Sequence, residues 1–268
     1  MASQPLIGSL HSRSSRYELK YFAGPATIER LRAEIAPWAQ PDQYARHRTG
    51  HRYLVDSQYF DSPDLTLYRA TVGGHKSRFK LRLRSYDDGS DSVFAEIKRR
   101  VNDVIVKTRS RVSATVAEQI EEWTLGGPRP HLQSGGGLES FVQALSLLEA
   151  RPAVRVRYQR EAYETVTPPI VRVTFDFDLA YSISHGWGHA AIEPAWHHVP
   201  VEGAVVEIKF NDVFPAWLAD LVHTLELRRQ PIPKYALAVS DAGAHHARWL
   251  GSGSVGLPFL ASTLPRIS

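Results

Sequence analysis

Strict alternation of apolar and polar residues recurs along the chain, and it predicts β-strands. In residues 78–84 apolar side chains alternate with cationic ones, which are Arg78, Lys80, Arg82 and Arg84. Successive side chains of a strand point to opposite faces, so this segment would carry an apolar face and a cationic face. Neighbouring cations on one face lie roughly 7 Å apart and repel one another unless an anion lies along them. The alternative is a solvated surface strand with a charged edge.

The same alternation appears in other segments, which makes a shared binding face a stronger interpretation of residues 78–84 than an isolated charged surface strand. Residues 104–112 place Lys107, Arg109 and Arg111 on one face, and residues 171–178 place Arg172 and Asp176 on one face. The pattern Glu-x-Lys occurs in three alternating segments, as Glu18/Lys20, Glu96/Lys98 and Glu207/Lys209. Together these segments predict one charged surface that several strands share.

The remaining pattern predicts a mainly antiparallel protein with peripheral helices. Further strands are expected at 17–22, 52–60, 153–165, 170–178, 180–183, near 190–200 and at 204–210, and 78–86 with 92–100 form a hairpin around Asp87-Asp88-Gly89-Ser90. Helical spacing predicts helices at 25–40, a short one at 65–68, two within 114–150, one at 214–227 and one at 235–250.

These elements predict an α+β fold in which about eight antiparallel strands close into a barrel. The charged faces then point into a wet lumen just wide enough for a small ligand, and the apolar faces pack under helices. We expect residues 1–14 to be a flexible lead, 15–250 to be one domain, and 251–268 to be a loosely ordered tail.

The amino-acid composition excludes some kinds of catalytic and metal site and indicates the cellular compartment. None of the 268 residues is a cysteine, which excludes disulfides, thiol catalysis and cysteine metal sites and fits a cytoplasmic protein. The N-terminal stretch is polar and unlike a signal peptide, and no run reaches the roughly 20 apolar residues of a membrane helix. The histidines are scattered, which argues against a histidine metal site. The net charge is +4, with basic residues concentrated in strands, which favours a focused anion site over a surface that coats nucleic acid.

The chain resembles the catalytic domain of the vacuolar transporter chaperone (VTC) polyphosphate polymerases, within the CYTH or triphosphate tunnel metalloenzyme superfamily. The resemblance covers residues 16 to about 240. It rests on ordered motifs: Arg16-Tyr17-Glu18-Leu19-Lys20-Tyr21, Tyr59-Phe60-Asp61, Lys80-Leu81-Arg82-Leu83-Arg84-Ser85-Tyr86, Phe94-Ala95-Glu96-Ile97-Lys98, Tyr158-Gln159-Arg160-Glu161-Ala162-Tyr163, Val205-Val206-Glu207-Ile208-Lys209 and Pro233-Lys234-Tyr235.

The resemblance implies an eight-stranded tunnel that binds triphosphate along its interior. It implies phosphate contacts from Lys20, Arg82, Arg84, Lys98, Arg160, Arg172, Lys209 and Lys234, and a divalent metal, Mn²⁺ or Mg²⁺, held by Glu207. Lys80, Lys107 and Arg109 are further candidates for phosphate binding. Glu18 is a second candidate metal ligand; Glu96 and Asp176 are candidates that could instead only neutralise neighbouring cations.

Two departures from the resemblance are visible in the sequence. The superfamily's Glu-x-Glu-x-Lys is shortened to Glu18-Leu19-Lys20, because Arg16 stands at the first position. Strict alternation from Arg160 places Arg155 and Arg157 on the opposite face. Either a bulge intervenes, or those two arginines face inward.

These residues lead to one main hypothesis and two alternatives. The main one is a polyphosphate polymerase in which the terminal phosphate of a growing polyphosphate attacks the γ-phosphate of ATP, with Lys98, Arg82 and Arg84 stabilising the transferring group. The alternatives are a tunnel phosphohydrolase and a module that binds polyphosphate or nucleotides without turnover. The expected partners are ATP and polyphosphate. A nucleic acid is not expected, and a separate membrane protein and the oligomeric state stay open.

Overall fold

One antiparallel sheet contains all the strands in the part of the chain that the computed structural model describes, which is residues 16–87, 91–102, 104–131, 136–183 and 195–245. The expected lead at 1–14 and tail at 251–268 lie outside these residues, as does the end of the helix expected at 235–250. The strands are β1 (Arg16–Ala23), β2 (Ala39–Pro41), β3 (Arg52–Asp61), β4 (Ser77–Tyr86), β5 (Ser92–Val101), β6 (Val104–Ser113), β7 (Arg151–Thr165), β8 (Val171–Ser182), β9 (His197–His198) and β10 (Ala204–Asn211).

Six α-helices lie on the outside of the sheet or against one end of it in the described chain. They are α1 (Pro25–Ile35), α2 (Thr66–Val72), α3 (Ala114–Thr124), α4 (Gly136–Leu147), α5 (Ala216–Thr224) and α6 (Lys234–His245), with a 3-10 turn at Thr49–His51. None of the described helices is long and apolar enough to cross a membrane.

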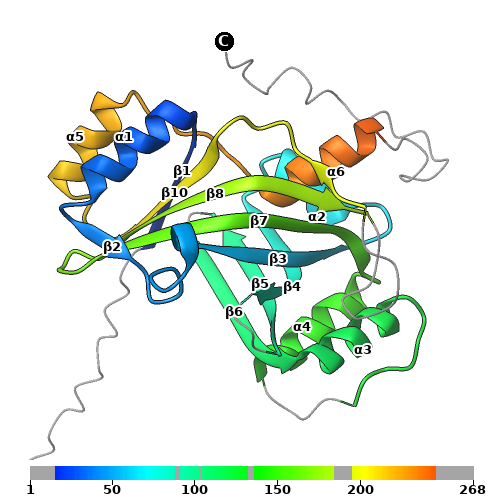
Figure 1. Cartoon of the computed structure of the whole chain (residues 1–268). Helices are drawn as coiled ribbons and strands as arrows, with labels where there is room; N and C mark the ends of the chain where they lie inside the picture. The colour runs from blue at the N-terminus through cyan, green and yellow to red at the C-terminus, as the bar shows by residue number, and fades with distance from the viewer. Residues whose placement is uncertain (1–15, 88–90, 103, 132–135, 184–194, 246–268) are drawn as a thin grey trace, which may run out of the picture.

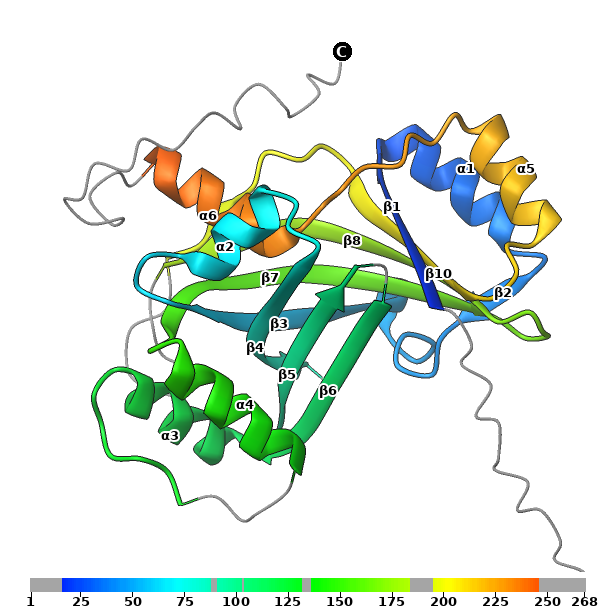
Figure 2. The ribbon, with the colours of Figure 1, turned by 180° about the vertical axis from the view of Figure 1, so that it is seen from behind.

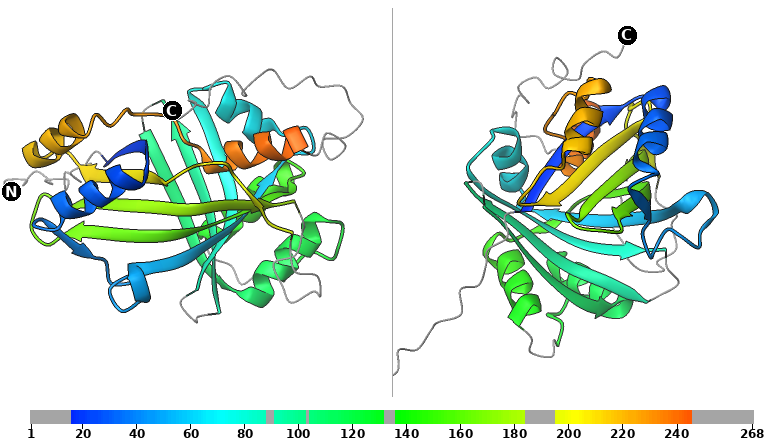
Figure 3. Two further views of the ribbon diagram at one scale, coloured as in Figure 1. Left: turned by 45° about the horizontal axis from the view of Figure 1, so that its top comes forward. Right: turned by 90° about the vertical axis from the view of Figure 1, so that its left-hand side faces the viewer.

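The sheet confirms the expected class and strand arrangement, with one difference in closure. Its path runs β1-β10-β8-β7-β3-β4-β5-β6, while β2 pairs with β7 and β9 with β8. All pairings are antiparallel, as the alternating pattern predicts. The described strands β1 and β6 are not hydrogen-bonded to each other, so the sheet curls without closing into a hydrogen-bonded barrel (Figure 3).

Helices cover the apolar faces of the sheet in pairs. α1 and α5 pack on the outer face of β1, β10 and β8 through Leu31, Ile35 and Leu218, and α3 with α4 pack on β4 and β5 (Figures 1 and 2). Burial of such aliphatic side chains stabilises each contact by about 1.5–3 kcal/mol per residue. The apolar positions of the alternating strands are therefore outside, and the charged positions are left facing inward.

The third pair differs, because α6 packs against inner-face residues. Tyr235, Ala236 and Val239 of α6 join one buried cluster with Tyr59, Val154 and other residues of β3 and β7. α2 lies beside α6 (Figure 1). This end of the curved sheet is therefore filled by apolar contacts, and the charged residues occupy the remainder of the inner face.

Several elements differ from the expected boundaries: the helix expected at 65–68 spans Thr66–Val72, the one expected at 214–227 spans Ala216–Thr224, and two further differences have local reasons. The helix expected at 25–40 ends at Ile35, because the chain then pairs Ala39 with Thr165 as β2. The strands expected at 170–178 and 180–183 are one strand, β8, whose register against β7 shifts between Arg157 and Gln159. Asp178 within that shift has φ 52°, a left-handed conformation that marks the bulge.

Gly203 permits the tight entry into β10. Its φ is +95°, and a Cβ there would lie 2.1 Å from the carbonyl oxygen of Ala23. Only glycine tolerates both conditions, and the close approach lets β10 begin its pairing with β1 at Ala204.

Candidate active site

The cations of β4, β5 and β6 share the inner face because of strand register. Lys80 pairs with Lys98 and Lys98 with Lys107, while Arg82 pairs with Glu96 and Glu96 with Arg109. Directly opposed residues of an antiparallel pair project to the same side of the sheet. The predicted Arg/Lys ladder of 78–84 is thus placed beside the two neighbouring charged strands.

Glu96 is the buried carboxylate of this group. Arg82 donates to Glu96 Oε2 through Nε at 2.7 Å and approaches it with Nη2 at 2.6 Å, and Lys107 Nζ lies 2.6 Å from Oε1. Arg109 Nε lies 3.4 Å from the same Oε1. Burial alone would raise the pKa of Glu96, but Arg82, Arg84 and Lys107 lower it well below its usual range. Glu96 therefore stays ionised and fixes the arginine and lysine around it.

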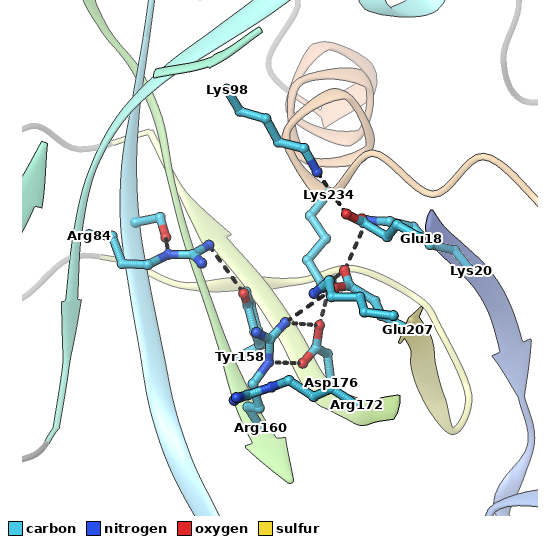
Figure 4. A network of polar contacts seen from close by, with 12 residues as sticks. Glu18, Lys20, Arg84, Lys98, Tyr158, Arg160, Arg172, Asp176, Glu207 and Lys234 are labelled. Atoms are coloured by element: carbon cyan, nitrogen blue, oxygen red, sulfur yellow. Dashed lines mark hydrogen bonds and ion pairs between the residues drawn. The ribbon is translucent and has the colours of Figure 1, made fainter. Parts of the chain in front are cut away.

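A second group of charges comes from β1, β8, β10 and α6 (Figure 4). Glu207 Oε1 accepts from Lys20 and from Lys234, both at 2.8 Å, and Glu207 Oε2 accepts from Lys209 at 2.7 Å. Lys20 Nζ also lies 3.0 Å from Glu18 Oε1. Although burial opposes ionisation, these lysines hold the pKa of Glu207 well below its usual range.

Asp176, like Glu96 and Glu207, is a buried carboxylate on the inner face, and it accepts a bidentate pair of hydrogen bonds from Arg160. Arg160 donates through Nε at 2.6 Å and Nη2 at 2.8 Å, and Lys234 Nζ lies 2.5 Å from Asp176 Oδ2. Arg160 Nη2 is also 3.7 Å from Glu207 Oε2. The fork geometry orients the guanidinium and joins this carboxylate to the Glu207 group.

Three cations of the ladder, Arg78, Lys80 and Arg84, have no carboxylate contact in the described part of the chain, and Arg78 donates to the carbonyl oxygen of His75. Arg84 donates through Nε to Ser57 Oγ at 2.9 Å and through Nη2 to Tyr158 Oη at 3.2 Å. Burial and repulsion from Lys20, Lys98 and Arg82 lower the pKa of Lys80 to about 7. Burial likewise lowers the pKa of Lys209 to about 8, against the attraction of Glu207. The inner face thus has an excess of positive charge that an anion would relieve.

The structure brings most of the predicted site residues together and places a few at the edges. Arg172 binds Asp42 at 2.5 Å and lies 3.4 Å from Tyr53 Oη, and its ion pairs in the described chain are with Asp42 and Glu164 and not with Glu96, Asp176 or Glu207. Lys98, Lys107 and Arg109 are more than a third exposed, and Arg109 lies 3.5 Å from the centre of the Phe94 ring.

The open question about β7 has a clear answer. Arg160 faces inward, as do Tyr158 and Val156, so alternation is unbroken from Arg155 to Arg160, and the register shift of β7 against β3 lies earlier, at Ala153. Arg155 and Arg157 lie on the opposite face, where Arg155 binds Asp56 at 2.9 Å and Arg157 lies 3.9 Å from the Trp196 ring centre. The bulge falls in β8 instead, at Asp178.

Two tyrosines at the site were not among the predicted residues. Tyr59 Oη accepts from Arg82 Nη1 at 3.0 Å, and Tyr158 Oη accepts from Arg84. Burial would raise the pKa of Tyr59, but Arg82, Arg84 and Lys80 lower it to about 7. Alternation within Tyr59-Phe60-Asp61 and Tyr158-Gln159-Arg160 could have placed both tyrosines on the inner face. Aromatic residues are common on both faces of a strand, however, so this signal alone does not mark a site residue.

The positions of the carboxylates show whether this site could hold a divalent metal ion. In the described residues, no group of three or more His, Cys, Asp or Glu side chains is placed to hold a metal. Glu18 and Glu207 nevertheless converge on one point, the ammonium of Lys20. Mg²⁺ and Mn²⁺ need one or two carboxylates when phosphate oxygens and waters complete the shell. This pair fits such a cation, which would compete with Lys20 for the carboxylates.

Comparison with solved structures gives distant similarities. A Bacillus halodurans protein described as an adenylate cyclase candidate is 14% identical, with a TM-score of 0.47, over 82% of this chain and 95% of that one. HpAC1 from Hippeastrum, an adenylyl cyclase candidate with a dominant triphosphatase activity, is 14% identical, with a TM-score of 0.48, over 84% of this chain and 95% of that one. Both superpositions are too loose to carry a conclusion about this site.

The comparison with protein families is decisive. No curated protein matches the sequence. The family model of the VTC domain, in contrast, matches residues 15–242, which include every described strand and all but the end of α6. The chain therefore belongs to the VTC domain family.

Proposed function

We propose that the protein is a polyphosphate polymerase that transfers the γ-phosphoryl group of ATP to a growing polyphosphate chain on the inner face of the sheet. The observation that carries this proposal is the charge of that face. Lys80 and Arg84 lie there without a carboxylate contact in the described chain, beside cations already held in place by Glu96, Asp176 and Glu207. A triphosphate carries about four negative charges and would satisfy this excess. Membership of the VTC domain family agrees with it.

The reaction needs positioning and charge neutralisation more than covalent chemistry. A terminal oxygen of polyphosphate forms a bond to the γ-phosphorus, the bond from that phosphorus to the bridging oxygen breaks, and ADP leaves with the electron pair. Arg82, Arg84 and Lys98 neutralise the transferring group. Arg82 and Arg84 are already oriented by Glu96, Ser57 and tyrosine hydroxyls, so little reorganisation accompanies the reaction.

The other cations bind the rest of the phosphate chain. Lys20, Lys209, Lys234 and Arg160 surround Glu207 and would contact phosphates that lie along β1 and β10. Glu207 and Glu18 would hold Mn²⁺ or Mg²⁺, which when bound neutralises phosphate oxygens. Lys107, Arg109 and Arg172, at the more exposed edges, would contact the chain as it enters or leaves.

Product analysis tests the proposal. The purified protein is incubated with ATP and Mn²⁺ or Mg²⁺, and the products are separated by gel electrophoresis and by anion-exchange chromatography. A long anionic polymer together with ADP is the expected result. Release of phosphate or tripolyphosphate without polymer would overturn polymerase activity in favour of a hydrolase. Tight tripolyphosphate binding with no turnover under either metal would instead indicate a binding module.

A further inference from the structure

Asp61, at the end of β3, is a buried carboxylate that makes no ion pair in the described chain. It is 1% exposed. It accepts backbone hydrogen bonds from Ser62, Leu67 and Tyr68, each at 2.8 Å, and a short hydrogen bond from the hydroxyl of Tyr235. Two of these donors, Leu67 and Tyr68, tie it to the first turn of α2. The fourth ties it to α6.

Tyr235 stands next to a residue of the candidate active site. Its ring stacks on Tyr59 at 5.0 Å between centroids, with an interplanar angle of 23°. The preceding residue, Lys234, is the first of α6 and extends to Asp176 at 2.5 Å and Glu207 at 2.8 Å (Figure 4). The position of the Tyr235 side chain therefore constrains the backbone from which Lys234 extends.

The burial of Lys234 makes this constraint consequential. Its side chain is 6% exposed, and it contacts both Asp176 and Glu207, closer to Glu207 than Arg160, which lies 3.7 Å from that carboxylate. A small displacement of the start of α6 would leave a buried ammonium with weaker partners, which is costly in a region shielded from water. The two motifs Tyr59-Phe60-Asp61 and Pro233-Lys234-Tyr235, far apart in sequence, meet at Tyr235, which bonds to Asp61 and stacks on Tyr59.

We propose that Asp61 and Tyr235 are positioning residues, and that their hydrogen bond fixes Lys234 between Asp176 and Glu207. The effect of this bond on phosphate binding rests on the proposed function, whereas the placement of Lys234 itself does not. Neither positioning residue contacts the transferring group. Both act through Lys234.

Chemical labelling of Lys234 tests the placement without any phosphate ligand. The full chain is treated briefly with acetic anhydride, and acetylation of Lys234 is measured by peptide mass spectrometry. Tyr235→Phe keeps the ring and its stacking but removes the hydroxyl, and it should raise the labelling rate of Lys234 roughly tenfold, the scale of one lost hydrogen bond to a charged group. Tyr68→Phe is the matched control. It removes a hydroxyl bonded to Ser240 at 3.0 Å, which also joins α2 to α6, and should leave the rate unchanged. Equal rates in wild type and Tyr235→Phe, or equal increases in both variants, would overturn the proposal.

A double-mutant cycle connects the placement to binding. Tripolyphosphate affinity is measured by calorimetry for wild type, Tyr235→Phe, Lys234→Met and the double variant. Tyr235→Phe should weaken binding roughly tenfold in the wild-type background and less than about twofold when Lys234 is absent. Additive losses would mean that Tyr235 supports the fold alone, and would overturn the positioning role. If wild type binds no tripolyphosphate, the proposed function fails, while the labelling rates still decide this inference.

Discussion

Lys98 on β5 and Glu18 on β1 form an ion pair, with Nζ 2.9 Å from Oε2, that spans the two open ends of the sheet. β1 is the first strand of the sheet path, and β5 is next to its last strand, β6. The inner face is therefore completed by side chains where the backbone does not close it. Glu18 is shared with Lys20, so this bridge also joins the Lys98 side of the site to the Glu207 group.

Removal of this bridge should hardly change stability. Lys98→Met loses the contact to Glu18, but the lysine is more than a third exposed, so the pair is worth about 0–1 kcal/mol. Urea unfolding followed by circular dichroism should show a loss within that range. A loss above about 3 kcal/mol, the range of a broken buried pair, would show that the bridge holds the curved sheet together.

The inner arginines should dominate triphosphate binding. Arg82→Ala with Arg84→Ala removes two oriented guanidiniums, and hydrogen bonds to charged groups contribute about 1.5–3 kcal/mol each. Tripolyphosphate affinity by calorimetry should therefore fall by about 10²- to 10⁴-fold. Arg30→Ala with Arg99→Ala removes the same charge from exposed outer positions and is the matched control. An equal, small loss in both double variants would place the ligand elsewhere.

Much of this architecture was predictable because its information is local. Alternation identified β1, β4, β5, β6, β8 and β10, and it identified the inner side of each, since one apolar residue in two marks the packed face. The ends of elements were less predictable. Trp38 continues the helical period of α1 but lies beyond its end, where its ring stacks on Trp217 of α5 at 5.3 Å. That contact depends on tertiary structure alone.

The partners of the site residues were not predictable for a related reason. Asp42, which binds Arg172, follows β2 in a segment with no charge alternation. The stacking of Tyr59 on Tyr235 joins residues from β3 and α6, and nothing in either segment specifies the other. The sequence did not predict that the sheet stays open between β1 and β6. Strand alternation is the same in a curled open sheet and in a closed barrel.

Lys80 should take up a proton when triphosphate binds. Its pKa of about 7 in the free protein means that the amine is mostly neutral at pH 8, and a bound anion favours the charged form. Calorimetry at pH 8 in buffers of different ionisation enthalpy measures the protons taken up. Wild type should take up more protons than Lys80→Met, by up to about one per site. Equal proton uptake would mean that Lys80 does not contact the anion.

The same pKa has a consequence for the stability of the free protein. Because the folded pKa of Lys80 lies below the ordinary value of 10.5, the unfolded chain binds more protons between about pH 7 and 10. The contribution of Lys80 to the free energy of unfolding therefore increases as pH rises through that window. Urea unfolding of wild type and Lys80→Met at pH 7 and pH 9 should show a larger increase in wild type, because the lowered pKa values of Lys209 and Tyr59 contribute with the same sign in both proteins. The opposite sign would contradict the lowered pKa.

Replacement of Glu207 is expected to separate phosphate binding from turnover. Glu207→Gln leaves Lys20, Lys209, Lys234 and Arg160 near one another without their shared carboxylate, and breaking a buried ionic group costs about 3–5 kcal/mol. The free variant should therefore melt at a lower temperature than wild type. Tripolyphosphate replaces the missing negative charge, so it should raise the melting temperature of the variant by more than that of wild type. Polymer formation from ATP should be lost if Glu207 also holds the metal. A variant that still makes polymer at the wild-type rate would show that Glu207 only neutralises the lysines around it.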